Sequence, residues 1–365
     1  MDAILNDIAR QLAELAKKRE NLAGCLRKTD NLGKTQFTSK IKVIDLEKLK
    51  IVGVDGGFLK KEYHGVGFIL RRAVATCFEY EKNKLKATNY FPSAKPVPEV
   101  TYTGPELSES EFSIFASLKR EEIELQTAIR AIEQFNPDIL IRDGSIVLYP
   151  SSMPEKSSPI YKTYLRVLDL FKELYATCEE KKILLCGAVE DSRGKRYCGL
   201  ISDEAIPALL DSQIPDDLKK QIMQSVGIID NTTDTLFLYY LLNVGERTAA
   251  MDYSHSTELP ILKDLESYAH KIFAMYLKAV EFDRPLRIDF LSNPDDLQET
   301  ADKIASIVFA VSKQNRTYAY PNVLIEADAR AKLTEVEIEH FKAAITEKLG
   351  RNPSLFELRR ELRPF

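Results

Sequence analysis

The sequence has few cysteines and no long apolar run. Its five cysteines are Cys25, Cys77, Cys178, Cys186 and Cys198. An odd number without a C-x-x-C pair or metal-like spacing predicts reduced, mostly packing cysteines rather than a disulfide framework or a zinc site. No segment approaches the ~20 apolar residues of a membrane span, so no membrane contact is expected. Asp2, Asp7 and Arg10 interrupt the stretch where a signal peptide would be apolar, which predicts a cytoplasmic protein.

The sequence also lacks a strong excess of charge of either sign. Fifty-one basic and fifty-five acidic residues give a net charge of -4, so bulk charge does not indicate a nucleic-acid binder, and any such contact must be local. There is no internal repeat or low-complexity tract. A chain of 365 residues with 44% hydrophobic and 29% charged residues is typical of a globular protein of roughly two domains' length.

The apolar pattern predicts alternating strands and helices. Residues 50–57 are expected to form a buried strand, and the β-rich segments 64–76 and 84–91 complete a three-stranded meander. A proline-rich loop over 91–98 precedes a long amphipathic helix that starts with a capping box of Ser108 and Glu111. Further elements are expected as helices at 2–27, 159–180, 295–312 and 327–349 and as strands at 137–144, 182–188 and 285–290.

This order predicts an α/β fold with a mixed sheet flanked by helices and with additional helical insertions. Ribonuclease H-like nucleases and actin-like phosphotransferases share such an arrangement, and the fold alone does not choose between them. Residues 1–30 are expected to be an N-terminal helix that contacts a second subunit or a partner, or that docks on its own domain. Residues 31–349 would form the main domain and residues 350–365 a C-terminal helix.

Two acids occupy equivalent places in this pattern. Asp55 in VGVDGG and Asp143 in ILIRDGS are each expected at the carboxyl end of a buried strand, before a glycine. Adjacent strands would bring the two carboxylates together, where they repel unless a cation lies between them. Hard oxygen ligands suit Mg²⁺ or Mn²⁺, so the pair predicts a divalent-metal site. Taken singly, an Asp before a Gly is most often a turn residue.

The long helix offers a third acid. Glu121 falls on the apolar stripe with Leu118 and Leu125, and Glu124 lies at the edge of that stripe. An acid that faces a core needs a partner, which favours a role at the site. Alternatively, Glu121, Glu122 and Glu124 all belong to a solvated face of the helix.

Two further features are weaker on pattern alone. Asp328 is an ordinary acid for the first turn of the last helix. Arg193, Lys195 and Arg196 cluster after strand 182–188, in a loop that would face a site at the carboxyl ends of the strands. They are candidates for DNA binding, or simply a solvated basic loop.

An ordered set of motifs resembles the NurA family, the nucleases that work with the HerA translocase in DNA end processing. The motifs are VGVDGG, PDILIRDGS, GAVEDSR, TDTLFLYYLLNVGERT, RPLRIDF and AYPNVLIEADARA. The resemblance implies a ribonuclease H-like nuclease domain with manganese- or magnesium-dependent 5′ to 3′ exonuclease activity and endonuclease activity on single strands. It also implies a homodimer around DNA that acts in double-strand break end resection with a HerA-type hexameric ATPase.

The resemblance extends to individual residues. Asp55 and Asp143 match the family's strand acids, and Asp328 matches its late polar position. The family's E-L-x-x-A pattern falls on Glu124, whereas the helical pattern favours Glu121, so both stay candidates and one is expected to be dispensable. The implied metal ligands are Asp55, Asp143, Glu124 and Asp328.

Two other functions compete with a nuclease. GVDGG is similar to the first phosphate loop of actin-like sugar kinases and ATPases, but Phe58, Leu59 and Lys60 follow where that loop continues to a threonine or serine. A non-catalytic adaptor that grips DNA ends or an ATPase would require a missing acid, and every candidate acid is present.

Overall fold

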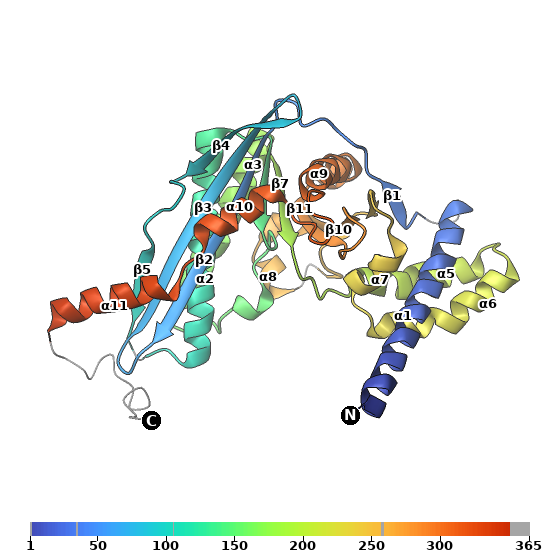
Figure 1. Ribbon diagram of the computed structural model, residues 1–365, viewed down its shortest axis with the longest axis horizontal. Coiled ribbons are helices and arrows are strands. Elements are labelled where there is room, and N and C mark those ends of the chain that lie inside the picture. The colour runs from blue at the N-terminus through green and yellow to red at the C-terminus, as the bar shows by residue number, and fades with distance from the viewer. Residues whose placement is uncertain (1, 34–35, 105, 257–258, 351–365) are drawn as a thin grey trace. The chain divides into compact units, whose positions relative to one another are not determined.

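A computed structural model describes residues 2–33, 36–104, 106–256 and 259–350 (Figure 1). The chain divides into two compact units, each assembled from separate parts of the sequence. The first unit comprises residues 1–44, 187–257 and 270–322, and the second comprises residues 45–186, 258–269 and 323–365. From residue 351 on, the C-terminal helix expected over 350–365 lies outside the described residues.

The second unit is built on a mixed sheet with the strand order β7-β6-β2-β3-β4. The antiparallel pairs β2–β3 and β3–β4 form the predicted meander, β5 adds to β3, and β6 runs parallel to β2. The predicted α/β fold with a ribonuclease H-like mixed sheet is therefore confirmed. The strands are β2 (Lys50–Glu62), β3 (Gly67–Glu81), β4 (Lys84–Phe91), β5 (Glu99–Thr103), β6 (Ile139–Asp143) and β7 (Leu184–Val189), within which the chain passes to the first unit.

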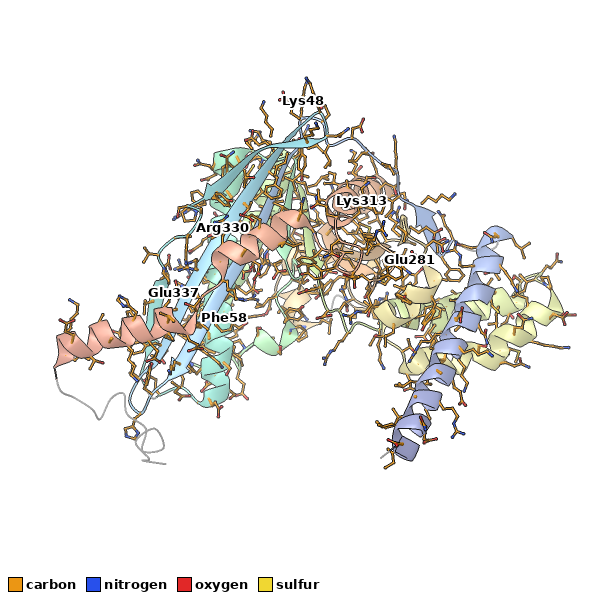
Figure 2. The ribbon with its side chains drawn as sticks, viewed as in Figure 1. Lys48, Phe58, Glu281, Lys313, Arg330 and Glu337 are labelled. Atoms are coloured by element: carbon orange, nitrogen blue, oxygen red, sulfur yellow. The ribbon has the colours of Figure 1, made fainter. Side chains whose placement is uncertain are left out.

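Helices cover both faces of this sheet (Figure 1). The helices α2 (Glu109–Phe135) and α3 (Tyr161–Lys181) lie on one face, and α10 (Asn322–Ala331) and α11 (Glu335–Leu349) lie on the other. Strand alternation decides which side chain serves which face. Phe58, labelled in Figure 2, packs with Phe112 of α2, whereas Leu59 belongs to the cluster around Ile338 of α11. A short helix, α8 (Pro260–Lys263), completes the unit.

The long helix α2 begins as predicted. The Ser108 side chain accepts a hydrogen bond from the backbone N–H of Glu111, and the Glu111 carboxylate accepts one from the N–H of Ser108. This reciprocal pair satisfies two N–H groups that a helix start leaves without partners. The apolar stripe of α2 is buried, with Leu118 and Leu125 fully inaccessible.

The strand β2 is longer than the sequence indicates. It continues in register with β3 as far as Glu62, so Asp55 lies inside β2 rather than at its carboxyl end. Gly56 and Gly57 pair with Ala73 and Arg72 in the extended conformation, although the Gly-Gly pair favours a strand end. The prediction for Asp143 is correct, because it is the last residue of β6.

The last helix expected over 327–349 is in fact two helices. Thr334 starts α11 with a capping box to Glu337, and the backbone carbonyl of Lys332 accepts a hydrogen bond of 3.1 Å from the buried Arg72. Arg72 also pairs with Glu337, which Figure 2 labels. These long-range contacts stabilise the break at residues 332–334. As a result, Asp328 lies in the second half of α10 and not in the first turn of the last helix.

The first unit has its own antiparallel strands, in the order β1-β8-β10-β11, with β9 paired to β10. Its short helices between the strands are the helical insertions that the sequence predicted. The strands are β1 (Thr38–Lys40), β8 (Glu246–Thr248), β9 (Met251–Asp252), β10 (Ile272–Lys278) and β11 (Leu286–Leu291). The helices are α1 (Asp2–Asn31), α4 (Arg196–Leu200), α5 (Ile206–Asp211), α6 (Asp216–Ser225), α7 (Asp234–Leu241) and α9 (Leu297–Ser312).

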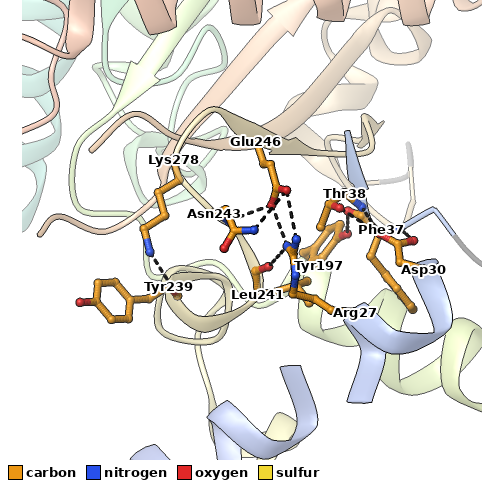
Figure 3. A network of polar contacts seen from close by, with 10 residues as sticks. All are labelled: Arg27, Asp30, Phe37, Thr38, Tyr197, Tyr239, Leu241, Asn243, Glu246 and Lys278. Atoms are coloured by element: carbon orange, nitrogen blue, oxygen red, sulfur yellow. Dashed lines mark hydrogen bonds and ion pairs between the residues drawn. The ribbon is translucent and has the colours of Figure 1, made fainter. Parts of the chain in front are cut away.

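The C-terminal half of α1 docks on its own unit. Leu22 and Leu26 are fully buried in a core shared with α6 and α7. Arg27 donates hydrogen bonds of 2.7 Å to the Glu246 carboxylate and to the carbonyl oxygen of Leu241 (Figure 3). Both kinds of contact tie the helix to the sheet and helices that follow it.

The N-terminal half of α1 leaves its apolar stripe in solvent. Ile4, Leu5, Ile8 and Leu12 are all about half exposed or more. Contact of this helix with a second subunit or a partner stays a prediction.

The cysteine prediction is confirmed, since all five cysteines are buried and none of them forms a disulfide. Among the residues that the structure describes, no helix combines the length and the apolarity needed to cross a bilayer.

Candidate metal centre and active site

One face of β2 lies directly under α10. An ideal Cβ on Gly53 would come 2.9 Å from the backbone carbonyl of Val323, and one on Gly57 would come 2.6 Å from the backbone oxygen of Ala331. Any side chain at these two positions would push the helix away. Gly53 and Gly57 flank Asp55 on the same face of the strand. The glycines of VGVDGG thus bring α10, with Asp328, close to Asp55, and they lie in a continuous strand rather than in a phosphate loop.

Asp55 and Asp143 are neighbours on this face. The parallel register pairs Gly53 with Ile141 and Val54 with Arg142, so Asp55 and Asp143 follow at the same level of adjacent strands. Asp55 is buried, with 5% of its surface exposed, and Asp143 is half-buried. The sequence prediction that adjacent strands bring these two acids together agrees with this register.

Glu124 approaches the same place from the other face of the sheet. Its Oε1 lies 2.6 Å from the position of an ideal Cβ on Gly56, the residue after Asp55. The β2–β6 pairing ends at Val54, so β2 is open along this edge beside Asp55 and Gly56. Glu124 is 1% exposed, and its Oε1 is buried without a hydrogen-bond partner.

Two arginines bracket the helix glutamates. Arg142 Nη2 donates hydrogen bonds of 2.7 Å to both Glu121 Oε2 and Glu124 Oε2. Arg120 donates a 3.1 Å bond from Nη2 to Glu121 Oε1, and its Nη1 lies 3.4 Å from Glu124 Oε1. Both oxygens of Glu121 therefore accept hydrogen bonds from arginines. Oε1 of Glu124 accepts none and lies beside Gly56, the residue after Asp55. Both glutamates are buried, so the alternative of a solvated helix face is wrong.

The pKa values express the same asymmetry. Burial raises the pKa of Asp55 to about 8, and the negative charges of Asp143, Glu124 and Asp328 add to the shift. Burial also raises the pKa of Glu124 to about 7, against the opposing effect of Arg120. For Glu121, burial is outweighed by Arg142 and Arg120, which hold its pKa below the ordinary value. Negative charge is thus left uncompensated around Asp55.

The donor set fits a hard divalent cation. Asp55, Asp143, Glu124 and Asp328 offer carboxylate oxygens, the ligands that Mg²⁺ and Mn²⁺ prefer. The buried Oε1 of Glu124 accepts no hydrogen bond, although Arg120 lies 3.4 Å away, so a metal ion could take up this oxygen. Among the described residues, the structure has no group of three or more His, Cys, Asp or Glu side chains arranged to hold a metal ion. Arginines contact both oxygens of Glu124 instead.

The basic residues predicted to bind DNA lie in the first unit. Arg193 and Lys195 are exposed, and Lys195 Nζ donates a 3.2 Å hydrogen bond to the backbone carbonyl of Asp230. Arg196 starts α4 and donates to the ring of His255. Their contact with DNA stays a prediction.

Sequence reasoning missed the arginine pair. Arg142 is 1% exposed and sits in the middle of the otherwise apolar segment ILIRDGS. A charged residue inside a buried strand requires a buried countercharge, and that was the available signal. Arg120 gave no signal, since it resembles any other cation on an amphipathic helix.

The protein has a ribonuclease H-like sheet, with Asp55 on β2 and Asp143 on the adjacent strand β6. The family model described as NurA domain matches residues 49–333, and the chain therefore belongs to the NurA family.

The chain is also similar to solved structures of NurA proteins. The NurA nuclease from Sulfolobus solfataricus is 16% identical, with 94% of this chain and 97% of that chain covered and a TM-score of 0.54, a likeness that establishes the fold alone. A structure of NurA bound to dAMP and manganese is 12% identical, with 96% and 98% covered and a TM-score of 0.48. No curated protein sequence matches the chain.

Proposed function

We propose that this protein is a divalent-metal-dependent DNA nuclease whose metal ligands are Asp55, Asp143, Glu124 and Asp328. The observation that carries the proposal is the convergence of carboxylates on the buried Asp55: Asp143 lies at the same level of the adjacent strand and Glu124 lies against Gly56. Membership in the NurA family supports hydrolysis of a phosphodiester as the reaction.

The four acids come from four different elements. Asp55 and Asp143 would hold the ion from adjacent strands, Glu124 from α2 and Asp328 from α10. Mn²⁺ or Mg²⁺, when bound, neutralises charge on the phosphate and lowers the pKa of water. Arg142 fixes the second oxygen of Glu124, which leaves Oε1 to face the site. A one-step in-line hydrolysis of this kind requires no covalent nucleophile from the protein.

Glu121 has a different role in this proposal. Its two oxygens are occupied by Arg142 and Arg120, so it serves as the countercharge of the buried Arg142. The dispensable member of the pair of helix glutamates is then Glu121, and Glu124 binds the metal.

The family resemblance supports further proposals about the activity and assembly of this protein. We propose 5′ to 3′ exonuclease activity, endonuclease activity on single strands, a homodimer, and a role in double-strand break end resection in the cytoplasm. A HerA-type hexameric ATPase is the proposed partner. The net charge of -4 fits a nuclease that depends on a partner for DNA affinity, because a protein without an excess of positive charge has a weak long-range attraction to DNA.

The two alternatives have less support. In an actin-like kinase the glycines of GVDGG would line a phosphate loop, whereas here they lie within β2, against α10 and Glu124. A non-catalytic adaptor would lack one of the acids, and all four are present.

The test is degradation of end-labelled linear and closed circular DNA by the purified protein in Mn²⁺, with Asp55→Ala and Asp143→Ala beside the wild type. We expect both variants to lose activity while they keep their circular dichroism spectrum. The proposal fails if the wild type cuts neither substrate, with or without a HerA-type partner, or if both variants cut like the wild type.

A further inference from the structure

We propose that Arg120 is an internal counter-cation that competes with the divalent metal for Glu124 and so sets the metal affinity of the site. The inference rests on the proposed nuclease function. In this inference, a residue that is not itself a metal ligand controls how tightly the ion binds.

The first observation is the position of the guanidinium. Arg120 Nη1 lies 3.4 Å from Glu124 Oε1, the same oxygen that faces Gly56 and the strand of Asp55. The carboxylates of Asp55 and Asp143 also act electrostatically on Arg120, after those of Glu124 and Glu121. The guanidinium therefore neutralises in part the negative charge that a divalent ion would neutralise.

The second observation is that the contacts of Arg120 are loose. The distance to Glu124 is long for a charge-assisted hydrogen bond, which is about 2.7–2.9 Å. The Nε atoms of Arg120 and Arg142 are both buried without a hydrogen-bond partner, so the two arginines differ in the length of their contacts with Glu124 and in their exposure, not in this donor. About a quarter of the Arg120 side chain (26%) is exposed, whereas the side chain of Arg142 is 1% exposed, so Arg120 is the less enclosed of the two.

Arg142 has no such freedom. Its side chain is 1% exposed and donates to Glu121, Glu124 and the backbone carbonyl of Ser145. The ring of Phe171 lies 5.1 Å from its guanidinium carbon. Of the two arginines beside Glu124, only Arg120 is placed to leave when a metal ion binds. Glu121 would still have Arg142 as a partner after that movement.

A metal titration without DNA tests the inference. Free Mn²⁺ is measured by electron paramagnetic resonance during titration of wild type, Arg120→Gln and Arg120→Lys at pH 8. Removal of one cation a few ångströms from the ligands is expected to tighten Mn²⁺ binding about tenfold in Arg120→Gln. Arg120→Lys keeps the positive charge and is expected to bind within about threefold of wild type.

Lys119→Gln is the matched control. Lys119 is the neighbouring cation on α2, but its Nζ pairs with Glu122 at 2.9 Å, and Glu122 also has Arg71 at 3.0 Å. Its removal should leave Mn²⁺ affinity unchanged. Arg120→Met, a neutral side chain of similar length, replaces Arg120→Gln if the latter does not fold.

The outcomes separate the inference from the proposed function. If the wild type binds Mn²⁺ and the neutral variants bind it equally or more weakly, Arg120 does not compete and the inference is overturned. If the wild type neither binds Mn²⁺ nor cuts DNA, the proposed function fails, and the inference falls with it. If Mn²⁺ binds more tightly to the neutral Arg120 variants but not to Arg120→Lys or Lys119→Gln, the result supports the inference and the metal site of the proposed function.

Discussion

The carboxylate of Glu124 lies against the backbone of Gly56. Oε1 of Glu124 is 2.6 Å from the place that a Cβ at position 56 would take, a separation that real Cβ atoms essentially never have. Glycine at this position therefore allows an acid on α2 to reach the strand that carries Asp55.

Gly56→Ala is expected to move Glu124 away from β2. The methyl group would force the buried carboxylate to shift, at a cost of about 1–3 kcal/mol in the free energy of unfolding. We expect nuclease activity to fall at least tenfold and Mn²⁺ binding to weaken. Urea denaturation and a DNA degradation assay measure the two effects.

Gly24→Ala is the control for this substitution, because a Cβ at Gly24 meets nothing within 4 Å. Gly24 lies inside α1, where alanine raises helix propensity and should add up to about 1 kcal/mol to stability. Full activity of the Gly56→Ala protein would contradict the placement of Glu124 at the site.

Glu124→Gln and Glu121→Gln should differ in kind. Glu124→Gln removes a proposed metal ligand, so we expect a loss of activity of about a hundredfold with a folded protein. Glu121→Gln weakens the countercharge of the buried Arg142 and should cost about 1–3 kcal/mol of stability while activity is retained. Parallel measurement of activity and urea midpoint distinguishes them, and the reverse result would assign the ligand to Glu121.

The metal-free protein should lose stability as the pH rises. The pKa of Asp55 is raised from its ordinary 3.8 to about 8, so between these values the folded state holds a proton that the unfolded chain has released. The contribution is fully present below about pH 4 and is lost as the pH rises through about 8. A single group accounts for up to about 1.4 kcal/mol per pH unit.

Urea unfolding in EDTA from pH 5 to 8.5 measures this dependence. Asp55→Asn has no carboxyl group to titrate at this position. Its free energy of unfolding should therefore change less with pH than that of the wild type over this range. Parallel curves for the two proteins would show that Asp55 ionises normally.

The basic loop of the first unit should contribute to DNA affinity. The double variant Arg193→Ala, Lys195→Ala removes two exposed cations, and if both contact phosphates the slope of log Kd against log salt should fall by about 2. Removal of Lys17 and Lys18, which are exposed on α1 of the same unit, gives the charge-matched comparison. Equal salt slopes for the variant and the wild type would indicate a solvated loop without a DNA contact.

Local patterns were sufficient to predict part of the sheet. The apolar segments and their order give the meander of β2, β3 and β4, the strand β6 and the expectation that adjacent strands bring Asp55 and Asp143 together. The meander follows from the sequence because its consecutive segments form adjacent strands, whereas β6 pairs with the non-consecutive β2.

Contacts between distant segments were not predictable in the same way. The length of β2 and the break before Thr334 depend on α10 packing over Gly53 and Gly57 and on the contact of Arg72 with Lys332. Two consecutive glycines such as Gly56 and Gly57 occur both in turns and in strands that pack closely under a helix. The local sequence is the same in both cases, and the three-dimensional structure distinguishes them. The division into two units also follows spatial contacts rather than sequence order.

The central claim is that Asp55 and its neighbouring acids form one metal centre. Its most direct test is the number of Mn²⁺ ions bound per chain, measured by electron paramagnetic resonance at pH 8 for the wild type, Asp55→Asn and Asp45→Asn. Asp45 is an exposed acid of the same unit and provides the control. We expect the wild type and Asp45→Asn to bind Mn²⁺ equally and Asp55→Asn to lose binding at the same concentrations. Undiminished Mn²⁺ binding by a folded Asp55→Asn protein would contradict the claim.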